Sequence, residues 1–112
     1  MSTRLPGAKY KNVFDRGRST RGRLLVAWRC SSPDADRMAG VVVSKKTFHD
    51  AVDRNRAKRL MREAYRLLVK EGAAPERTEW VFVARREIGR ARCADVVEDL
   101  KCIMSRVSRP AR

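Results

Sequence analysis

The sequence predicts a single-domain α+β fold, in which three helices pack on a sheet with one antiparallel hairpin and one parallel pair. Apolar side chains recur with helical spacing over residues 51–69, two strand-like segments precede that stretch, and an apolar run of strand length follows it. The chain has 112 residues, about the usual size of one domain. We therefore expect residues 1–112 to form one domain.

The N-terminal part is expected to hold a loosely ordered end and one short helix. Residues 1–8 include a Pro-Gly pair, which disfavours regular structure. Residues 9–16 place Tyr10, Val13 and Phe14 at positions i, i+3 and i+4, where their side chains share one face of a helix. We therefore predict a short helix that presents two aromatic rings.

Two extended segments come next. Residues 18–30 are predicted to be extended, because side chains that suit the two faces of a strand alternate from Leu24 to Cys30. Residues 31–37 read SSPDADR, which has turn chemistry throughout, and residues 38–45 return as a second strand. The simplest arrangement is an antiparallel hairpin of these two strands.

The clearest helix runs from about Ala51 to Val69. At about 100° per residue, its apolar side chains gather on one side of the helix, and these include Ala57, Leu60, Met61, Ala64, Tyr65 and Leu68. A second arc, about 100° wide, holds Asn55, Lys58, Arg59, Arg62 and Arg66. The helix is therefore expected to have one packing face and one basic face.

The C-terminal part is expected to contain a buried strand and a last helix. Residues 79–85 form a continuous apolar run, which is typical of a strand covered on both faces. A strand, a long helix and another strand suggest a βαβ unit with a parallel pair. Residues 90–107 carry an apolar stripe at helical spacing, and residues 108–112 form a basic tail that we expect to be loosely ordered.

The charge of the chain points to a polyanionic partner. Lys and Arg number 27 against 13 Asp and Glu, which gives a net charge of +14. Of these 27 residues 20 are Arg, whose planar guanidinium matches phosphate and stacks on bases. Nucleic acid is the usual partner of such a chain, and an anionic membrane surface is the alternative.

The cysteines and the hydropathy indicate a cytoplasmic protein. Cys30, Cys93 and Cys102 are odd in number, form no C-x-x-C pair and follow no apolar signal segment. A reducing compartment fits them better than a secreted disulfide scaffold. No apolar run approaches the roughly 18 residues of a membrane-spanning helix.

One ordered set of motifs resembles a known family. The segment Val43–Lys46 (VSKK) is followed by Ala51–Arg66 (AVDRNRAKRLMREAYR). In these residues the sequence resembles the protein subunit of bacterial ribonuclease P, whose members carry an R-N-R element after a V-S-K-K strand end. Arg4–Leu5, residues 14–18 and residues 79–85 also resemble family motifs in the same order, so the resemblance covers nearly the whole chain.

The resemblance implies a fold and a function. The fold is a ribosomal-protein-domain-like α/β sandwich with a mostly antiparallel sheet, one parallel pair, three helices and a left-handed βαβ crossover. The function is that of a protein cofactor, one per catalytic RNA, that binds ribonuclease P RNA and the 5′ leader of precursor tRNA. The ribonucleoprotein removes that leader by endonucleolytic cleavage, with Mg²⁺ held mainly by the RNA and no cofactor bound by the protein alone.

The resemblance also implies which residues bind RNA. They are the basic and amide side chains of the VSKK and R-N-R segments, namely Lys45, Lys46, Arg54, Asn55, Arg56, Lys58, Arg59, Arg62 and Arg66. Cations on a rigid helix can follow a phosphate path, and each neutralised phosphate releases counterions. The alternative is a solvated amphipathic helix, but only Glu63 would offset the charge in the middle of the run.

Three aromatic residues are candidates for a second site. In the family, aromatics at positions matching Tyr10, Phe14 and Trp28 line a cleft that receives the single-stranded leader. Unpaired bases can stack on such rings, and Tyr10 would add a hydroxyl to the cleft. The alternative is that all three rings are core residues. Trp80 and Phe82 are expected in the core.

No catalytic or metal-binding constellation is expected in the protein itself. His49 is the only histidine and has no sequence signal for an orienting partner. The acidic residues form no E-x-x-H or D-x-D cluster. A stand-alone nuclease is therefore disfavoured, and the main competing hypothesis is a ribosomal or other structural RNA-binding protein.

Overall fold

The computed structural model describes residues 4–33, 35 and 37–108. Three α-helices, four strands and two 3₁₀ helices alternate along this part of the chain. In chain order they are η1 (Gly7–Lys9), α1 (Tyr10–Arg16), β1 (Arg18–Arg21), β2 (Leu25–Ser31), β3 (Met38–Val42), α2 (Ala51–Glu71), β4 (Thr78–Ala84), η2 (Arg86–Arg90) and α3 (Cys93–Ser108).

The strands form one mixed sheet in the order β1-β2-β4-β3. β1 and β2 are antiparallel, β2 and β4 are antiparallel, and β3 runs parallel to β4 with Gly40 opposite Val81. The predicted α+β fold with one parallel pair and three helices is therefore confirmed. The left-handed sense of the β3–α2–β4 crossover stays a prediction.

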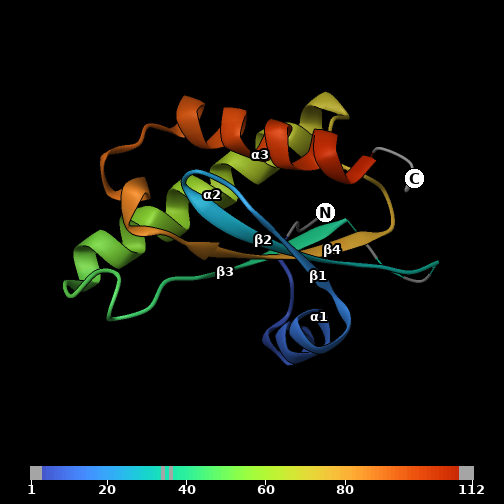
Figure 1. Cartoon of the computed structure of the whole chain (residues 1–112), viewed down its shortest axis with the longest axis horizontal. Coiled ribbons are helices and arrows are strands. Elements are labelled where there is room, and N and C mark those ends of the chain that lie inside the picture. The colour runs from blue at the N-terminus through green and yellow to red at the C-terminus, as the bar shows by residue number, and fades with distance from the viewer. Residues whose placement is uncertain (1–3, 34, 36, 109–112) are drawn as a thin grey trace.

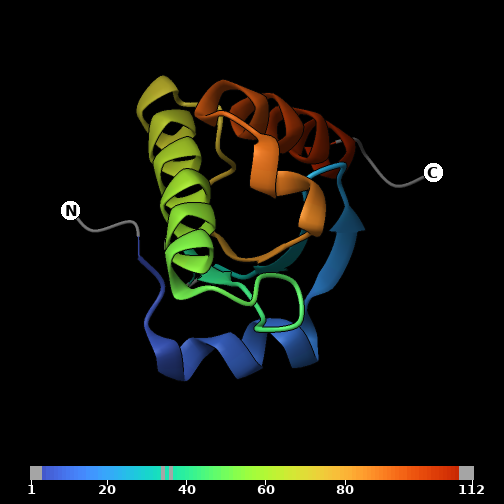
Figure 2. The same ribbon diagram turned by 90° about the vertical axis from the view of Figure 1, so that its left-hand side faces the viewer.

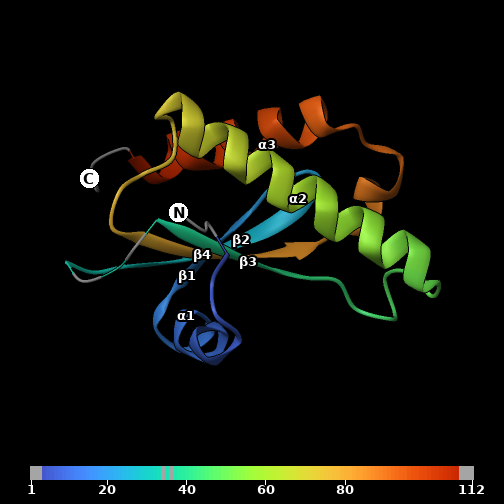
Figure 3. The ribbon, with the colours of Figure 1, turned by 180° about the vertical axis from the view of Figure 1, so that it is seen from behind.

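The helices cover the two faces of the sheet unequally. α2 and α3 lie side by side on one face, whereas the short helix α1 lies on the other (Figure 1). Figure 2 looks along this sandwich and shows α1 below the sheet with the two long helices above it. Figure 3 shows the same layers from behind, with α2 in front of α3.

The main core lies between the sheet and the two long helices. Trp80, Phe82 and Tyr65 are fully or almost fully buried there, and the rings of Tyr65 and Phe82 lie 5.6 Å apart edge to face. The expectation that Trp80 and Phe82 belong to the core is confirmed. A second, smaller cluster under α1 is built on Leu5, Val13 and Val81.

The long helix forms as its sequence pattern predicts. α2 buries Ala57, Met61 and Leu68 and ends at Gly72, whose φ of 77° is the left-handed conformation that glycine adopts without strain. The backbone N–H of Gly72 donates to carbonyl oxygens of the last helical turn. A glycine thus ends the helix, as the sequence indicates.

The predicted hairpin between residues 18–30 and 38–45 is wrong. β2 and β3 do not pair with each other, because β4 lies between them and pairs with both. β4 is buried on both of its faces, so it loses more water-exposed apolar surface in the centre of the sheet than at an edge. An alternation of side chains along a segment indicates that the segment is a strand, but it does not indicate which strands lie next to it in the sheet.

Residues 18–30 also differ from the single extended segment that we predicted. They form a hairpin of β1 and β2, which turns at residues 22–24, where the N–H of Gly22 donates to the carbonyl oxygen of Leu25 at 2.8 Å. A Cβ atom at Gly22 would lie 2.6 Å from Asp99 Oδ2. Glycine at this position therefore lets side chains of α3 approach the turn closely, a contact that the local sequence does not reveal.

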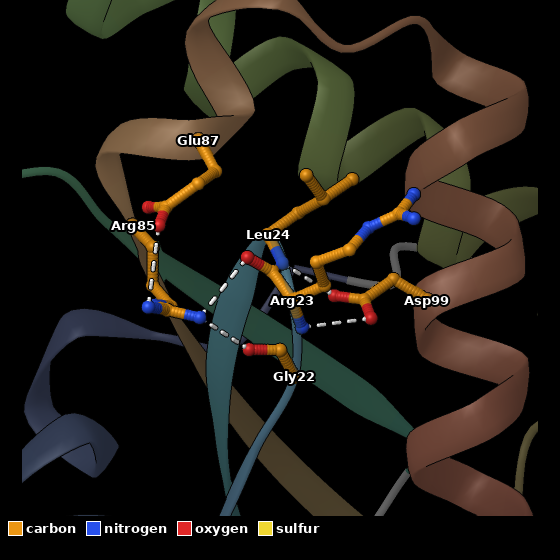
Figure 4. Close-up of polar contacts among 6 residues, drawn as sticks. All are labelled: Gly22, Arg23, Leu24, Arg85, Glu87 and Asp99. Carbon is orange, nitrogen blue, oxygen red and sulfur yellow. Dashed lines mark hydrogen bonds and ion pairs between the residues drawn. The ribbon is translucent and has the colours of Figure 1, made fainter.

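Two long-range contacts hold this turn (Figure 4). The carboxylate of Asp99 on α3 accepts hydrogen bonds from the backbone N–H groups of Arg23 and Leu24 at 3.0 and 2.9 Å. The guanidinium of Arg85 donates to the carbonyl oxygens of Gly22 and Arg23 at 2.9 and 3.1 Å. The β1–β2 turn is thus fixed to both the end of β4 and α3.

The ends of the chain were expected to be loosely ordered over residues 1–8 and 108–112. Residues 1–3 and 109–112 lie outside the described part, but Leu5 is buried and its N–H donates to the carbonyl oxygen of Ala39 at 3.0 Å. β3 is an edge strand of the sheet, so the backbone groups on its outer side have no neighbouring strand to pair with. The segment around Leu5 covers this edge and gives the carbonyl oxygen of Ala39 a hydrogen-bond partner. The segment around Leu5 thus packs on the sheet, and the loose order of the two ends stays a prediction.

Candidate nucleic-acid interface

The outward side of α2 carries cations that the protein does not neutralise. Arg59 is exposed, Lys58 and Arg62 are half-exposed, and Asn55 beside them is exposed. Within the described residues none of the four side chains has a hydrogen bond or an ion pair. We call Asn55, Lys58, Arg59 and Arg62 the basic face of α2. These side chains are available to an external partner.

Arg54 and Arg56 differ from this set, because the protein uses both guanidinium groups itself. Arg54 Nη1 donates to the carbonyl oxygens of Phe48 and His49 at 3.0 and 2.7 Å. Arg56 donates to the carbonyl oxygens of Gly89 and Ala91 at 3.1 and 2.8 Å. Both arginines therefore fix neighbouring segments against the start of α2, and they keep their positive charge in doing so.

Arg66 is paired along the helix. Its Nε donates to Glu63 Oε2 at 3.2 Å, and its Nη2 contacts Oε1 of the same carboxylate. This hydrogen bonding holds the pKa of Glu63 below its ordinary value and raises that of Arg66. Arg66 belongs to the predicted RNA-binding set, but an external phosphate would have to compete with Glu63 for it.

The loop between β3 and α2 presents the two predicted lysines. Lys45 and Lys46 are exposed, and neither has a partner within the described residues. A turn in which Ser44 accepts hydrogen bonds from the N–H groups of Thr47 and Phe48 places them after the end of β3. They stand next to α2 in the chain and are free to add charge to its N-terminal end.

The three predicted aromatics gather on the α1 side of the sheet. Phe14 and Trp28 pack edge to face with ring centroids 5.4 Å apart, and both rings are partly exposed. Tyr10 lies over β3, where its hydroxyl oxygen accepts a hydrogen bond from the N–H of Val41 at 3.1 Å. A Cβ atom at Gly40 would lie 2.3 Å from the Tyr10 ring. The hydroxyl thus completes the edge of β3, which the sequence did not indicate.

An apolar surface continues from these rings across the sheet. Val26 is opposite Val83 on the neighbouring strand, and Val83 is opposite Val42 on the next. Each of these valines lies two positions along its own strand from the row that contains Trp28. Their side chains therefore point to the same face of the sheet as Trp28. All three valines are partly exposed. We call Tyr10, Phe14, Trp28 and the three valines the aromatic face.

Two further arginines lie beside α2 and were not in the predicted set. Arg86 and Arg90 begin and end η2, and together with Arg56 they line a common pocket. Their spacing of four residues was the only local signal, and it does not show that η2 packs against the start of α2. That proximity follows from the β3–α2–β4 crossover.

Within residues 4–33, 35 and 37–108, no group of three or more His, Cys, Asp or Glu side chains could hold a metal ion. The ring of His49 is exposed and has no partner among these residues. None of the described helices is long and apolar enough to cross a membrane.

Comparison with known proteins identifies the family. A family model described as Ribonuclease P matches residues 5–108. The ribonuclease P protein component of Exiguobacterium sp. is 37% identical over 98 residues, which cover 88% of this chain and 82% of that protein. The component of Pelotomaculum thermopropionicum is 36% identical over 97 residues, which cover 87% and 84%.

Solved structures show the same fold. The RNase P protein from Thermotoga maritima has a TM-score of 0.79 at 24% identity, over 96% of this chain and 100% of that one. The RNase P protein of Staphylococcus aureus has a TM-score of 0.76 at 22% identity, over 96% and 97%. With the family match and the relatives above, the chain belongs to the ribonuclease P protein family, the protein components of the ribonucleoprotein that removes the 5′ leader from tRNA precursors.

Proposed function

We propose that this chain binds ribonuclease P RNA through the basic face of α2 and Lys45 and Lys46, and binds the leader of precursor tRNA through the aromatic face. The observation that carries this proposal is a row of cations on the long helix of a ribonuclease P protein, none of them paired within the described part of the chain. The helix fixes the backbone positions of these cations, so only their side chains must be ordered when they meet phosphates. Counterion release then favours the complex.

The two surfaces suit two different RNAs. The basic face belongs to α2, on one side of the sheet, and the aromatic face belongs to α1 and the strands on the other (Figure 1). A structured RNA offers a dense array of phosphates, which cations recognise, whereas a single-stranded leader offers exposed base faces, which rings and apolar side chains recognise. One chain can therefore contact the catalytic RNA and its substrate together.

In this arrangement the protein positions the substrate, and the RNA supplies the chemistry. Holding the leader against the protein while the tRNA body lies on the catalytic RNA raises the effective concentration of the cleavage site. Mg²⁺ would be held mainly by RNA phosphates, because the described residues offer no acidic or histidine cluster for it. The protein would add positive charge where the phosphates of precursor tRNA approach those of the catalytic RNA.

We also infer a cytoplasmic location and one chain per catalytic RNA. Cys30, Cys93 and Cys102 are free thiols, which suits a reducing compartment. One basic face and one aromatic face are sufficient for one catalytic RNA and one substrate.

Direct binding tests the proposal. The chain is titrated into labelled ribonuclease P RNA at several salt concentrations, and then precursor and mature tRNA are titrated into the complex. We expect tight, salt-dependent binding of the catalytic RNA and stronger binding of precursor than of mature tRNA. Equal binding of the catalytic RNA and an unrelated RNA of similar length would contradict it, and would favour a general structural RNA-binding role.

A further inference from the structure

A pocket lies where the first turns of α2 meet η2. Its volume is about 370 Å³, within the range of about 300–1,000 Å³ that is usual for small-molecule sites. The residues that line it come from the loop before α2, from α2 and from η2, and they are Phe48, Asp53, Arg56, Arg86, Gly89 and Arg90. Of these residues, only Arg56 belongs to the RNA-binding set that was predicted from the sequence.

The pocket has two free cations. Arg86 and Arg90 are exposed and have no partner within the described residues. Arg56 adds a third positive charge, and its hydrogen bonds to Gly89 and Ala91 fix the guanidinium in place. Three guanidinium groups around one concave surface form a strong site for a phosphate, whose oxygens accept their hydrogen bonds.

Two other groups show that a simple anion is not the best ligand. Asp53 also lines the pocket, is exposed and has no partner within the described residues, so its carboxylate would repel a free phosphate. Phe48 adds an aromatic ring. A carboxylate accepts hydrogen bonds from the amino group of a base, and a ring stacks on the face of a base. Cations, an acceptor and a ring together match the three chemical parts of a nucleotide.

The ring of Phe48 is held in position. A Cβ atom at Gly89 would lie 2.9 Å from Phe48 Cε1, so the ring edge packs closely over this glycine. The backbone on either side is fixed as well, because the N–H of Phe48 donates to Ser44 and its carbonyl oxygen accepts from Arg54. A ring that is already ordered loses little entropy when a base stacks on it.

We propose that this pocket binds one unpaired nucleotide of ribonuclease P RNA. The base stacks on Phe48 and donates from an exocyclic amino group to Asp53, and a phosphate lies between Arg86 and Arg90. The catalytic RNA is favoured over the substrate, because the pocket includes the first turns of α2 and so shares this helix with the basic face. This inference rests on the proposed function.

Base-specific chemical probing of ribonuclease P RNA with and without the protein tests the stacking. We expect at least one unpaired base to be protected from the chemical probe when the native chain or Phe48→Tyr is bound. The same base should react freely with the probe when Phe48→Leu is bound, because this variant retains apolar bulk but has no ring. The affinity for the RNA should fall roughly 5- to 100-fold in Phe48→Leu. Thermal unfolding of each variant confirms that it is folded.

The salt dependence of binding tests the phosphate contact. In the double variant R86Q/R90Q, the slope of log K against log salt should decrease by about 0.7–0.9, which corresponds to one lost phosphate contact. The matched control is Arg77→Gln, which removes an exposed charge just before β4, whereas Arg86 follows the other end of this strand. The control should leave the slope within error of the native value.

The outcomes separate this inference from the proposed function. If the native chain does not bind ribonuclease P RNA, the proposed function itself fails. If it binds, but Phe48→Leu protects the same bases and R86Q/R90Q keeps the native slope, the pocket proposal alone is wrong. A protection that needs added precursor tRNA would place the nucleotide in the substrate and overturn the assignment to the catalytic RNA.

Discussion

Arg56 donates a hydrogen bond of 2.8 Å from its guanidinium to the carbonyl oxygen of Ala91. This bond, with the one to Gly89, joins the start of α2 to the segment between β4 and α3. Arg59, three residues further along the same helix, is exposed and has no partner within the described chain. Two arginines of one basic run thus have different surroundings, which leads to opposite predictions for stability and for RNA binding.

Replacing Arg56 should affect folding. In Arg56→Gln the carbonyl oxygens of Gly89 and Ala91 lose charged donors, so the free energy of unfolding should fall by about 1–3 kcal/mol. Urea unfolding followed by circular dichroism measures this. The matched control is Arg59→Gln, which should change stability by less than about 0.5 kcal/mol. Equal stability of the two variants would show that the Arg56 contacts do not hold η2.

Replacing Arg59 should affect RNA binding. Arg59→Gln is expected to weaken binding to ribonuclease P RNA and to decrease the log–log salt slope by about 0.7–0.9, the value for one lost phosphate contact. Filter binding at four or more salt concentrations gives this slope. Arg77→Gln is again the control. An unchanged slope in Arg59→Gln would remove Arg59 from the interface.

The aromatic face should distinguish precursor from mature tRNA. In Trp28→Leu the edge-to-face partner of Phe14 and one stacking surface are lost, so binding of precursor tRNA should weaken by about 1–3 kcal/mol, while binding of mature tRNA changes little. The measurement is the ratio of the two affinities. Phe82→Leu alters a buried ring on the opposite face of the sheet, so it should lower stability without changing this ratio. A similar loss for both RNAs in Trp28→Leu would make Trp28 a core residue only.

The hydroxyl of Tyr10 should serve the fold rather than the leader. Tyr10→Phe leaves the N–H of Val41 without its acceptor, which should lower the free energy of unfolding by about 1 kcal/mol. The ratio of precursor to mature tRNA affinities should stay at the native value, because the ring is retained. A changed ratio with unchanged stability would instead place this hydroxyl against the leader.

The β1–β2 turn should depend on α3. Asp99→Ala removes the acceptor of two backbone N–H groups, so we expect a loss of roughly 1–3 kcal/mol in stability and a melting temperature several degrees lower. The neighbouring Glu98→Ala is the control, because its side chain is exposed and has no partner among the described residues. If both variants melt with the native chain, the turn is held by Arg85 and its own backbone alone.

The elements of the fold were more predictable than their pairing. Helical periodicity gave α2 nearly to the residue, because one buried face repeats over six turns and Gly72 ends the helix. The continuous apolar run gave β4 and its burial on both faces. The neighbours of β4 could not be predicted, since alternation in β2 and β3 suits any partner. The β1–β2 turn was missed because the close contact at Gly22 comes from Asp99, 77 positions away in the chain.

The sequence indicated the residue types of the candidate RNA-binding site. It did not indicate which of these side chains are free to bind a partner. The sequence places Arg54, Arg56, Arg59 and Arg66 in one basic run, and helical spacing puts Arg54 and Arg56 outside the basic arc without showing what they contact. The structure separates them, since backbone carbonyls hold the first two, Glu63 holds the last, and Arg59 is free within the described chain. Arg86 and Arg90 join the start of α2 only through the fold.

The most direct test of the function is reconstituted cleavage. Ribonuclease P RNA is mixed with labelled precursor tRNA at low Mg²⁺, with and without this chain, and release of the 5′ leader is followed over time. We predict cleavage that depends on the chain, is weakened in Arg59→Gln and is absent with the chain alone. Equal cleavage with and without the chain at every Mg²⁺ concentration tested would contradict its role as the protein component.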